Sequence, residues 1–227
     1  MTYPQNRLQL SSGNKKRMEP PVYLLSSTKV EGAKNLPVIK TKFLDVDIAI
    51  DNYDVIVFTS KNGVEAVNRL GIDWKRKPSI AIGEATAEKI KSLNGRPSFV
   101  VATSYGDELA VEITKRFRFL KFLYPRAKEI ASNLPEIIRQ KGSEITEVVV
   151  YETVCNDDAL EAPENGSVIV FSSPSTVKCF VQKFGWNDSY KCVAIGKTTA
   201  KAIDFCDDVV ISTEQTLESA VEVAKTL

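Results

Sequence analysis

Hydroxyl side chains and glycines recur where buried apolar runs of this sequence give way to helical patterns. Thr59 and Ser60, for example, directly follow the run Val55–Phe58. The set found at such junctions is Thr59, Ser60, Lys61, Gly83, Thr103, Ser104, Ser172, Ser173, Gly196, Lys197, Thr198, Thr199, Ser212 and Thr213. In open parallel sheets, ligands bind at this edge, and the amides and dipole of a helix N-terminus attract anions. The pattern indicates a binding site for an anionic small molecule, although each residue taken singly fits an N-cap or a tight turn equally well.

The side chains that are missing limit the chemistry further. The sequence has no histidine, which excludes a Ser-His-Asp or Cys-His nucleophile and any His-ligated metal. Acid–base chemistry therefore falls to Asp, Glu, Lys, Tyr or Cys. The four cysteines form no CxxC pair and follow no secretion signal, so we expect buried reduced thiols, with no metal site and no disulfide.

The elements that must position these groups are encoded twice. An apolar strand ending in Phe-Thr-Ser, a helical run and an Ala-Ile-Gly turn before a second helix occur from Val55 to Ile90. The same succession occurs from Val168 to Ile203, with Gly83 and Gly196 at matching places. A sequence motif that repeats at the spacing of a whole domain predicts two similar α/β domains with parallel sheets. The expected binding site is the cleft between these two domains.

The two copies of the motif differ in the elements that follow them. The first copy continues into a strand near 121–124, a helix and a strand over 147–153, whereas the second copy ends without them. The start of the chain supplies the missing unit, since Val22–Leu25 resembles the first of these strands and Pro37–Phe43 the second. We therefore expect a discontinuous domain of residues 20–40 plus 154–227, with the second domain, 47–148, inserted in the first.

Two segments lie outside those domains. The chain crosses between them at 41–46 and 149–153, and two extended crossings side by side are expected to pair as an antiparallel β linker. Residues 1–20 are polar and lack apolar periodicity, which predicts a flexible tail.

Composition excludes several classes of protein. Lys and Arg total 30 against 29 Asp and Glu, a balance that argues against nucleic acid. No apolar run is long enough to span a membrane, and the N-terminus lacks the apolar core of a signal peptide, so a cytoplasmic location is expected. Neither GxGxxG nor GxxxxGK[ST] occurs, which disfavours dinucleotides and P-loop chemistry. A monomer is the default expectation.

At this point the sequence resembles a known family, the uroporphyrinogen-III synthases, from Val22 to the C-terminus. The segments that carry the resemblance are the Phe-Thr-Ser and Phe-Ser-Ser-Pro strand ends, Ile82-Gly83-x-x-Thr86-Ala87, Arg126 before a helix ending at Gly142, Val150-Tyr151-Glu152-Thr153, and Ala194-Ile195-Gly196-x-Thr198-Thr199-Ala200. The sequence departs from the family in the extra tail before Val22. Residues 26–36 are also too short for the helix that usually follows the first strand, so one turn or a loop is expected there.

The resemblance implies two flavodoxin-like α/β domains joined by a two-stranded linker. It also implies an enzyme of tetrapyrrole (haem, sirohaem or cobalamin) biosynthesis that uses no cofactor. Its substrate would be hydroxymethylbilane, a linear tetrapyrrole whose last ring is inverted as the macrocycle closes with loss of water. Hydroxymethylbilane synthase, the preceding enzyme, would be a transient partner. The alternative is a non-catalytic two-lobed module that binds an anionic small molecule.

The resemblance also assigns roles to particular residues. Tyr151 matches the family's tyrosine and lies at the expected linker, where its phenol would protonate or hydrogen-bond the leaving hydroxyl. A tyrosine that merely packs the linker fits the sequence equally well. Arg126, Lys61 and Lys197 would pair with substrate carboxylates, or else be solvated surface cations. Thr86 joins the substrate-binding set through its place in the Gly83 motif.

Overall fold

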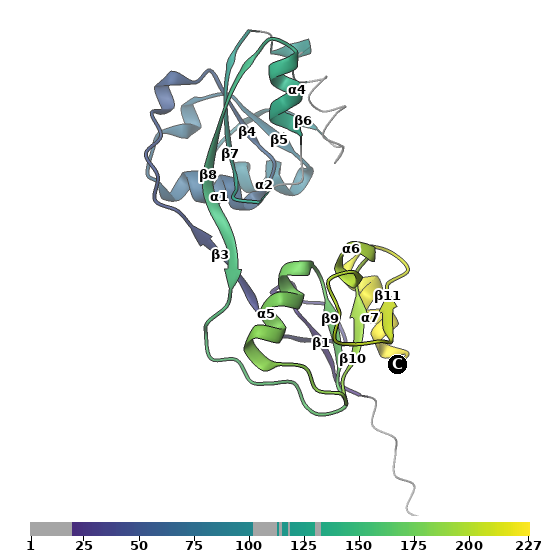
Figure 1. The fold of residues 1–227 in the computed structure, drawn as a ribbon. Coiled ribbons are helices and arrows are strands. Elements are labelled where there is room, and N and C mark those ends of the chain that lie inside the picture. The colour runs from purple at the N-terminus through teal and green to yellow at the C-terminus, as the bar shows by residue number, and fades with distance from the viewer. Residues whose placement is uncertain (1–19, 102–112, 114, 118, 130–132) are drawn as a thin grey trace, which may run out of the picture. The chain divides into compact units, whose positions relative to one another are not determined.

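The computed structural model describes residues 20–101, 113, 115–117, 119–129 and 133–227 (Figure 1). The chain divides into two compact units: Met1–Val38 with Asp158–Leu227, and Ile39–Asp157. We call them the terminal unit and the central unit. No helix in the described ranges is both long and apolar enough to cross a bilayer.

The terminal unit is built on a five-stranded sheet in which every pairing is parallel. Its spatial order is β11-β10-β9-β1-β2, so the two strands from the chain start lie at one side of the sheet. In chain order this reads 2-1-3-4-5, one of the two common orders of doubly wound sheets. The elements are β1 (Val22–Leu24), β2 (Lys34–Asn35), β9 (Val168–Phe171), α5 (Pro174–Phe184), β10 (Lys191–Ala194), α6 (Lys197–Ala200), β11 (Val209–Ile211) and α7 (Leu217–Lys225).

The central unit has a six-stranded sheet of order β3-β8-β7-β4-β5-β6. Five of its strands run parallel, and β3 pairs with β8 in the antiparallel sense, with Phe43 opposite Tyr151. The elements are β3 (Ile39–Phe43), β4 (Val55–Phe58), α1 (Lys61–Arg69), β5 (Ser79–Ile82), α2 (Glu84–Ser92), β6 (Pro97–Val101), β7 (Lys121–Ala127), α4 (Leu134–Gln140) and β8 (Glu144–Cys155), with short 3-10 turns at Ile50–Asn52 and Trp74–Arg76.

Helices cover both faces of the central sheet because its middle strands are apolar on both sides. All four residues of β4 are buried. Ile56 and Phe58 belong to the core under α1 and α2, whereas Val55 and Val57 belong to the core under α4. This continuous burial is typical of a parallel strand between two helical layers. The apolar runs of the sequence therefore determine which strands lie in the middle of each sheet.

Two expectations differ from the structure, and a third agrees with it. The strand beside β1 is Lys34–Asn35, and the Pro37–Phe43 run instead supplies β3 of the other unit. That assignment rested on the resemblance of Pro37–Phe43 to the strand over 147–153, and a likeness between two strands does not show which neighbour either one pairs with. The helix that Gly196 opens ends at Ala200, before Ile203. Residues 26–33, as expected from their number, form bends and a turn.

The cysteine prediction was wrong for two of the four residues. Cys155 and Cys179 are each disulfide-bonded, whereas Cys192 and Cys206 are free thiols. The prediction relied on spacing along the chain. A disulfide depends instead on how close the fold brings two Cα atoms, about 4.4–6.8 Å, which spacing does not reveal.

Candidate functional site

The parallel strands of the central unit end at one edge, and the predicted residues follow them there. Thr59 and Ser60 follow β4, and Gly83 follows β5. The pairing of Phe58 with Ala81 brings these two strand ends side by side. The carboxyl edge of a parallel sheet is where doubly wound proteins bind ligands. The topology therefore gathers the first copy of the motif into one place.

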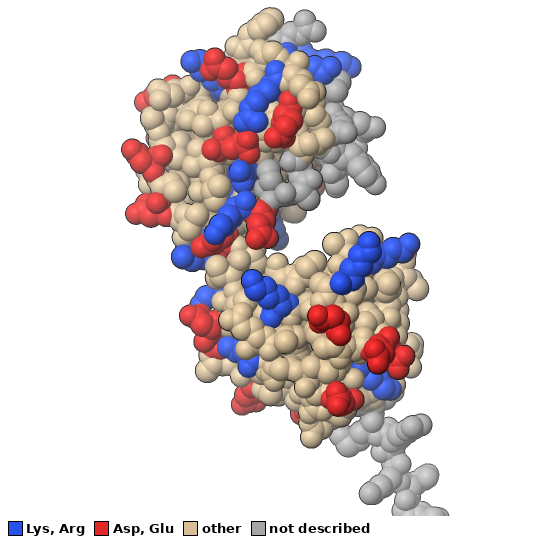
Figure 2. All heavy atoms as spheres, viewed as in Figure 1, with Lys and Arg blue, Asp and Glu red and all other residues tan. Residues whose placement is uncertain are grey.

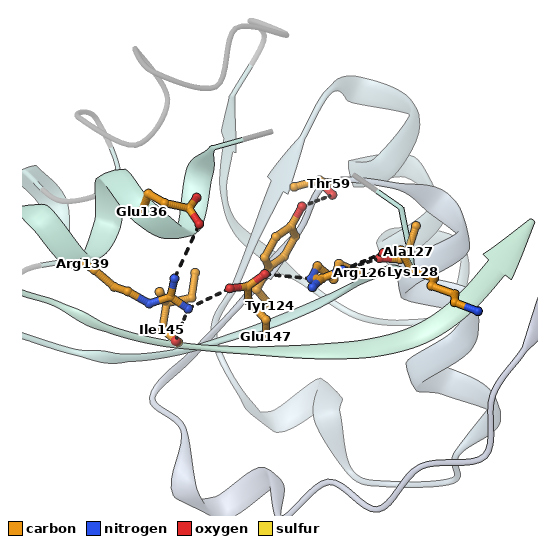
Figure 3. A network of polar contacts seen from close by, with 9 residues as sticks. All are labelled: Thr59, Tyr124, Arg126, Ala127, Lys128, Glu136, Arg139, Ile145 and Glu147. Carbon is orange, nitrogen blue, oxygen red and sulfur yellow. Dashed lines mark hydrogen bonds and ion pairs between the residues drawn. The ribbon is translucent and has the colours of Figure 1, made fainter. Parts of the chain in front are cut away.

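Thr59 contacts a residue that the sequence did not single out. The Tyr124 hydroxyl lies 3.3 Å from Thr59 Oγ1, and either group can donate the hydrogen bond (Figure 3). Tyr124 is 1% exposed, and burial raises the pKa of its phenol despite the opposing effect of the Thr59 hydrogen bond. The phenol thus stays protonated at neutral pH. A tyrosine that directly follows the apolar pair Phe122-Leu123 and precedes Pro125 was the clue that could have revealed it.

Ser60 and Lys61 begin α1 in different ways. The Ser60 hydroxyl accepts a hydrogen bond from the Asn62 amide at 3.2 Å, so this serine is an N-cap. Lys61, the first helical residue, is exposed. In the part of the chain that the structure describes, its ammonium group takes part in no ion pair, so it can meet an anion at the helix start.

Gly83 turns the chain between β5 and α2. Its φ of 80° and ψ of 145° are a conformation that side-chain-bearing residues rarely adopt. Its amide donates to the Val101 carbonyl at 2.9 Å, so that amide is already satisfied. Thr86, three residues on, is 4% exposed. Gly83 therefore shapes the turn, and Thr86 lies largely beneath the surface.

Arg126 is held inside a network of charges (Figure 3). Its Nε lies 2.8 Å from Glu147 Oε2, an ion-pair distance, although the N–H is not aligned for a hydrogen bond. Its Nη1 donates to the carbonyls of Ala127 and Lys128 at 2.8 and 3.1 Å. Glu147 also accepts from Arg139 Nη2 at 2.7 Å. A substrate carboxylate would have to compete with Glu147 for this guanidinium group.

Tyr151 lies in β8 where the pairing with β7 is irregular. Arg126 is opposite Val149 but Ala127 is opposite Tyr151, so Val150 is an extra residue. Such a bulge re-aims side chains, and Val150 and Tyr151, adjacent in sequence, both belong to the core under α1 and α2. Tyr151 is 9% exposed. The bulge thus lies at the residue that the sequence singled out.

The terminal unit carries the second copy of the motif at its own carboxyl edge. The Ser172 hydroxyl donates to the Leu25 carbonyl at 3.2 Å, joining the ends of β9 and β1. Ser173 is the N-cap of α5 in a reciprocal capping box with Thr176. The hydroxyls of both serines therefore have structural partners already.

The Gly196 turn differs from its counterpart. Gly196 has φ −173° and is buried, while Lys197 and Thr198 are exposed and Thr199 is buried. The Ala200 amide donates a hydrogen bond to the Gly196 carbonyl at 3.0 Å, and it is the first amide after Gly196 to form a hydrogen bond within this turn. The amides of the three residues between them point out of the helix start. Lys197 has no ion pair within the described residues. Thr103 and Ser104 lie outside those residues.

Charged side chains of both signs are mixed on the visible face of each unit (Figure 2). On the face shown in Figure 2, Lys and Arg stand beside Asp and Glu on both units. Within the described ranges, no group of three or more Cys, Asp or Glu side chains could hold a metal ion. The groups that the two carboxyl edges offer are therefore hydroxyls, amides, single ammonium groups and two buried phenols.

These features define a doubly wound α/β protein with hydroxyl groups, helix N-termini and two lysines at its strand ends. The family model for uroporphyrinogen-III synthase HemD matches residues 32–222, and the chain belongs to this family. Its members are cyclising lyases of tetrapyrrole biosynthesis.

Two relatives agree with that assignment. A protein of Methanocaldococcus jannaschii, provisionally named a uroporphyrinogen-III synthase, is 26% identical over 213 residues, which cover 81% of this chain and 83% of the relative. The crystal structure of uroporphyrinogen-III synthetase from Helicobacter pylori aligns with a TM-score of 0.73 at 23% identity. That alignment covers 91% of this chain and 99% of the other. The latter similarity establishes the α/β fold.

Proposed function

We propose that this chain converts hydroxymethylbilane into uroporphyrinogen III, inverting the last pyrrole ring and closing the macrocycle with loss of water. Membership of the family supports the reaction. The observation that carries the proposal for this particular chain is the β-bulge at Val150, beside Tyr151, in the unit that also holds the Thr59–Ser60 strand end.

Tyr151 is the group we propose for the chemical step. Departure of the substrate's hydroxyl needs a proton or a strong hydrogen bond, and a phenol O–H can supply either. The substrate's own pyrrole nitrogens stabilise the cation that remains. The protein's further contribution is to hold the chain end in position and to exclude water.

Lys61 and Lys197 are the cations that we propose for substrate carboxylates. Both are exposed at the first position of a helix, where the helix dipole adds to their own charge. Thr198, Thr199, Thr86 and the strand-end residues Thr59, Ser60, Ser104, Ser172 and Ser173 complete the proposed set, together with the turns at Gly83 and Gly196. Arg126 contributes less in this proposal, because Glu147 already neutralises it.

We further propose that the two units are flavodoxin-like domains and that β3 and β8 form the linker. The strand order of the terminal unit supports the first statement. The antiparallel pairing of β3 with β8, close to the points where the chain passes from one unit to the other, supports the second. A cytoplasmic monomer that receives its substrate through transient contact with hydroxymethylbilane synthase completes the proposal.

The reaction itself is tested by mixing freshly made hydroxymethylbilane with the purified protein. After oxidation, the porphyrin products are resolved by chromatography into isomers I and III. We expect mainly isomer III, with the amount growing in proportion to enzyme concentration. Isomer I alone, which forms without an enzyme, would contradict the proposal and favour a binding module without catalytic activity.

Tyr151 is tested separately by Tyr151→Phe. Loss of general-acid assistance is expected to lower kcat by about 10²-fold or more, while KM changes little. The melting temperature should stay nearly constant, because the phenyl ring still fills the same part of the core. Tyr190→Phe is the matched control, since it removes a hydroxyl that donates to the Pro163 carbonyl in the other unit. An unchanged kcat in Tyr151→Phe would remove this tyrosine from the mechanism.

A further inference from the structure

Two free thiols meet inside the terminal unit, one before the Gly196 turn in the chain and one after α6. Cys192 lies in β10 and is fully buried, whereas Cys206 follows α6 and is half-buried. Parallel pairing sets Cys192 opposite Val209, and Cys206 precedes Val209 by three residues. The neighbouring strands therefore bring together two cysteines that are fourteen residues apart.

The contact between the sulfurs is very close. The Cys192 thiol donates to Cys206 Sγ, and the two sulfur atoms are 2.7 Å apart. A disulfide bond measures about 2.05 Å, so only a small movement separates this pair from a covalent bond. Two thiolates sharing a tetrahedral metal at about 2.3 Å would lie about 3.8 Å apart. The geometry thus favours a disulfide over a metal site, and no third ligand completes one among the described residues.

The two thiols differ in access. A pocket of about 540 Å³ is lined by Cys206 together with Trp186, Phe205, Asp207 and Asp208, among others. Cys206 can be reached through this pocket, whereas Cys192 lies behind it, fully buried. Asp188 and Lys191 also line the pocket, so its three aspartates outnumber its one lysine, and this negative balance favours a small uncharged reactant over an anion. Cys206 is therefore the sulfur that meets an oxidant first.

The buried thiol, Cys192, is suited to react second, after Cys206 has been oxidised. Burial, reinforced by the contact with Cys206 and the charge of Asp208, raises the pKa of the Cys192 thiol far above its ordinary value. Cys192 consequently stays protonated and unreactive toward reagents in solution. It can still attack a sulfur that has already been oxidised, because that sulfur is in contact with it.

We propose that Cys192 and Cys206 form an oxidation site that closes into an intramolecular disulfide in the presence of a peroxide. The Cys206 sulfur attacks one peroxide oxygen, the O–O bond breaks, and a sulfenic acid and one molecule of water form when hydrogen peroxide is the oxidant. Cys192 then attacks the Cys206 sulfur, and the hydroxyl group leaves with the Cys192 proton as a second molecule of water. Both sulfurs are oxidised and the peroxide is reduced, so atoms and electrons balance.

The new bond would close a loop that contains the Gly196 turn and α6. Cross-linking a loop of about 15 residues restricts the unfolded chain, and for a protein of this size we expect the melting temperature to rise by roughly 5–10 °C. Oxidation would therefore stabilise the segment that bears Lys197 and Thr198 without changing any of its side chains.

The test treats the full chain with a small excess of hydrogen peroxide, blocks the remaining thiols with N-ethylmaleimide, and maps peptides without reduction. We expect a cross-linked pair of peptides containing Cys192 and Cys206, lighter by two hydrogen atoms than the unlinked pair. The melting temperature should rise as the cross-link accumulates.

Cys206→Ala is the matched control, because it removes the accessible thiol and leaves the buried one in place. This variant should form no cross-link and should show no peroxide-dependent rise in melting temperature. It also accounts for any effect of the treatment on the disulfide-bonded Cys155 and Cys179, which it retains. Blocking of both thiols by N-ethylmaleimide after peroxide treatment, or oxidation of Cys206 to a sulfinic acid without a cross-link, would overturn the proposal.

Discussion

The two glycines of the repeated motif should respond differently to the same substitution. Gly83 and Gly196 occupy matching places in the sequence, each between a strand and a helix. Their backbones differ, since Gly83 has φ 80° and ψ 145° whereas Gly196 has φ −173° and ψ 174°. We therefore expect Gly83→Ala to destabilise the central unit and Gly196→Ala to leave the terminal unit nearly unchanged.

The expected loss of unfolding free energy in Gly83→Ala comes from the backbone conformation alone. No heavy atom lies within 4 Å of an added Cβ, so there is no clash to relieve. Holding a non-glycine residue in this conformation costs about 1–3 kcal/mol. Alanine restricts the unfolded chain more than glycine does, and this offsets about 0.4–1 kcal/mol of the cost. The net loss of unfolding free energy should be about 1–2 kcal/mol.

The magnitude for Gly196→Ala comes from packing. Its φ is extended backbone that any residue adopts, and an added Cβ would lie 3.3 Å from Cγ and Cδ of Gln215. Gln215 is exposed, so its flexible side chain can move by the few tenths of an ångström required. This small cost and the gain from the unfolded chain are of similar size, about 0.5 kcal/mol. The expected change is close to zero.

The chain's two tryptophans allow each unit to be followed separately. Trp74 is buried against Phe58 in the central unit, and Trp186 belongs to the terminal unit. Urea unfolding is therefore followed by fluorescence in Trp186→Phe and Trp74→Phe backgrounds, which report on the central and terminal units respectively. Equal destabilisation by the two glycine substitutions, or a larger effect at Gly196, would refute the reasoning from backbone conformation.

Two further predictions follow from the polar network of the central unit. Glu147→Gln should lower the unfolding free energy by about 1–2 kcal/mol, because the buried Nε of a neighbouring arginine loses its ion-pair partner. Glu136→Gln, at a 3.8 Å contact on the exposed side of the same network, should cost less than about 0.5 kcal/mol, and urea titrations of both variants check this difference. For Tyr124, burial raises the pKa of the native phenol, so its contribution to stability is complete below the unfolded pKa of about 10 and is lost as pH rises toward the native pKa. Between pH 9 and 11, the unfolding free energy of Tyr124→Phe should therefore fall less than that of the unchanged protein. Parallel curves of unfolding free energy against pH for the two proteins would contradict the assignment.

Much of the fold could be predicted from local patterns. Apolar runs such as Val55–Phe58 predict the central strands, because a strand between two helical layers has no exposed face. Ser60 and Ser173 begin helices as their residue types predict, because a hydroxyl satisfies an amide left open in the first turn. These interactions span only a few residues.

The site could be predicted only in outline. The sequence indicated the strand-end residues and Tyr151, but not that Tyr124 would reach Thr59 or that Glu147 would neutralise Arg126. Both contacts join residues that are far apart in the chain, and they depend on which strands become neighbours. The bulge at Val150 was equally hidden, because it is a property of the pairing of β7 with β8.

The sequence by itself determined that the chain contains two copies of one α/β motif, with hydroxyls and glycines at the strand ends and no histidine for catalysis. Residue type and short-range spacing carry that information. Only the tertiary structure decided the bounds and register of the pairing of β3 with β8, which cysteines are disulfide-bonded and which remain thiols, and how the two matching glycines differ in backbone conformation. The physical reason is that register, sulfur–sulfur proximity and local backbone angles are set by packing between distant segments.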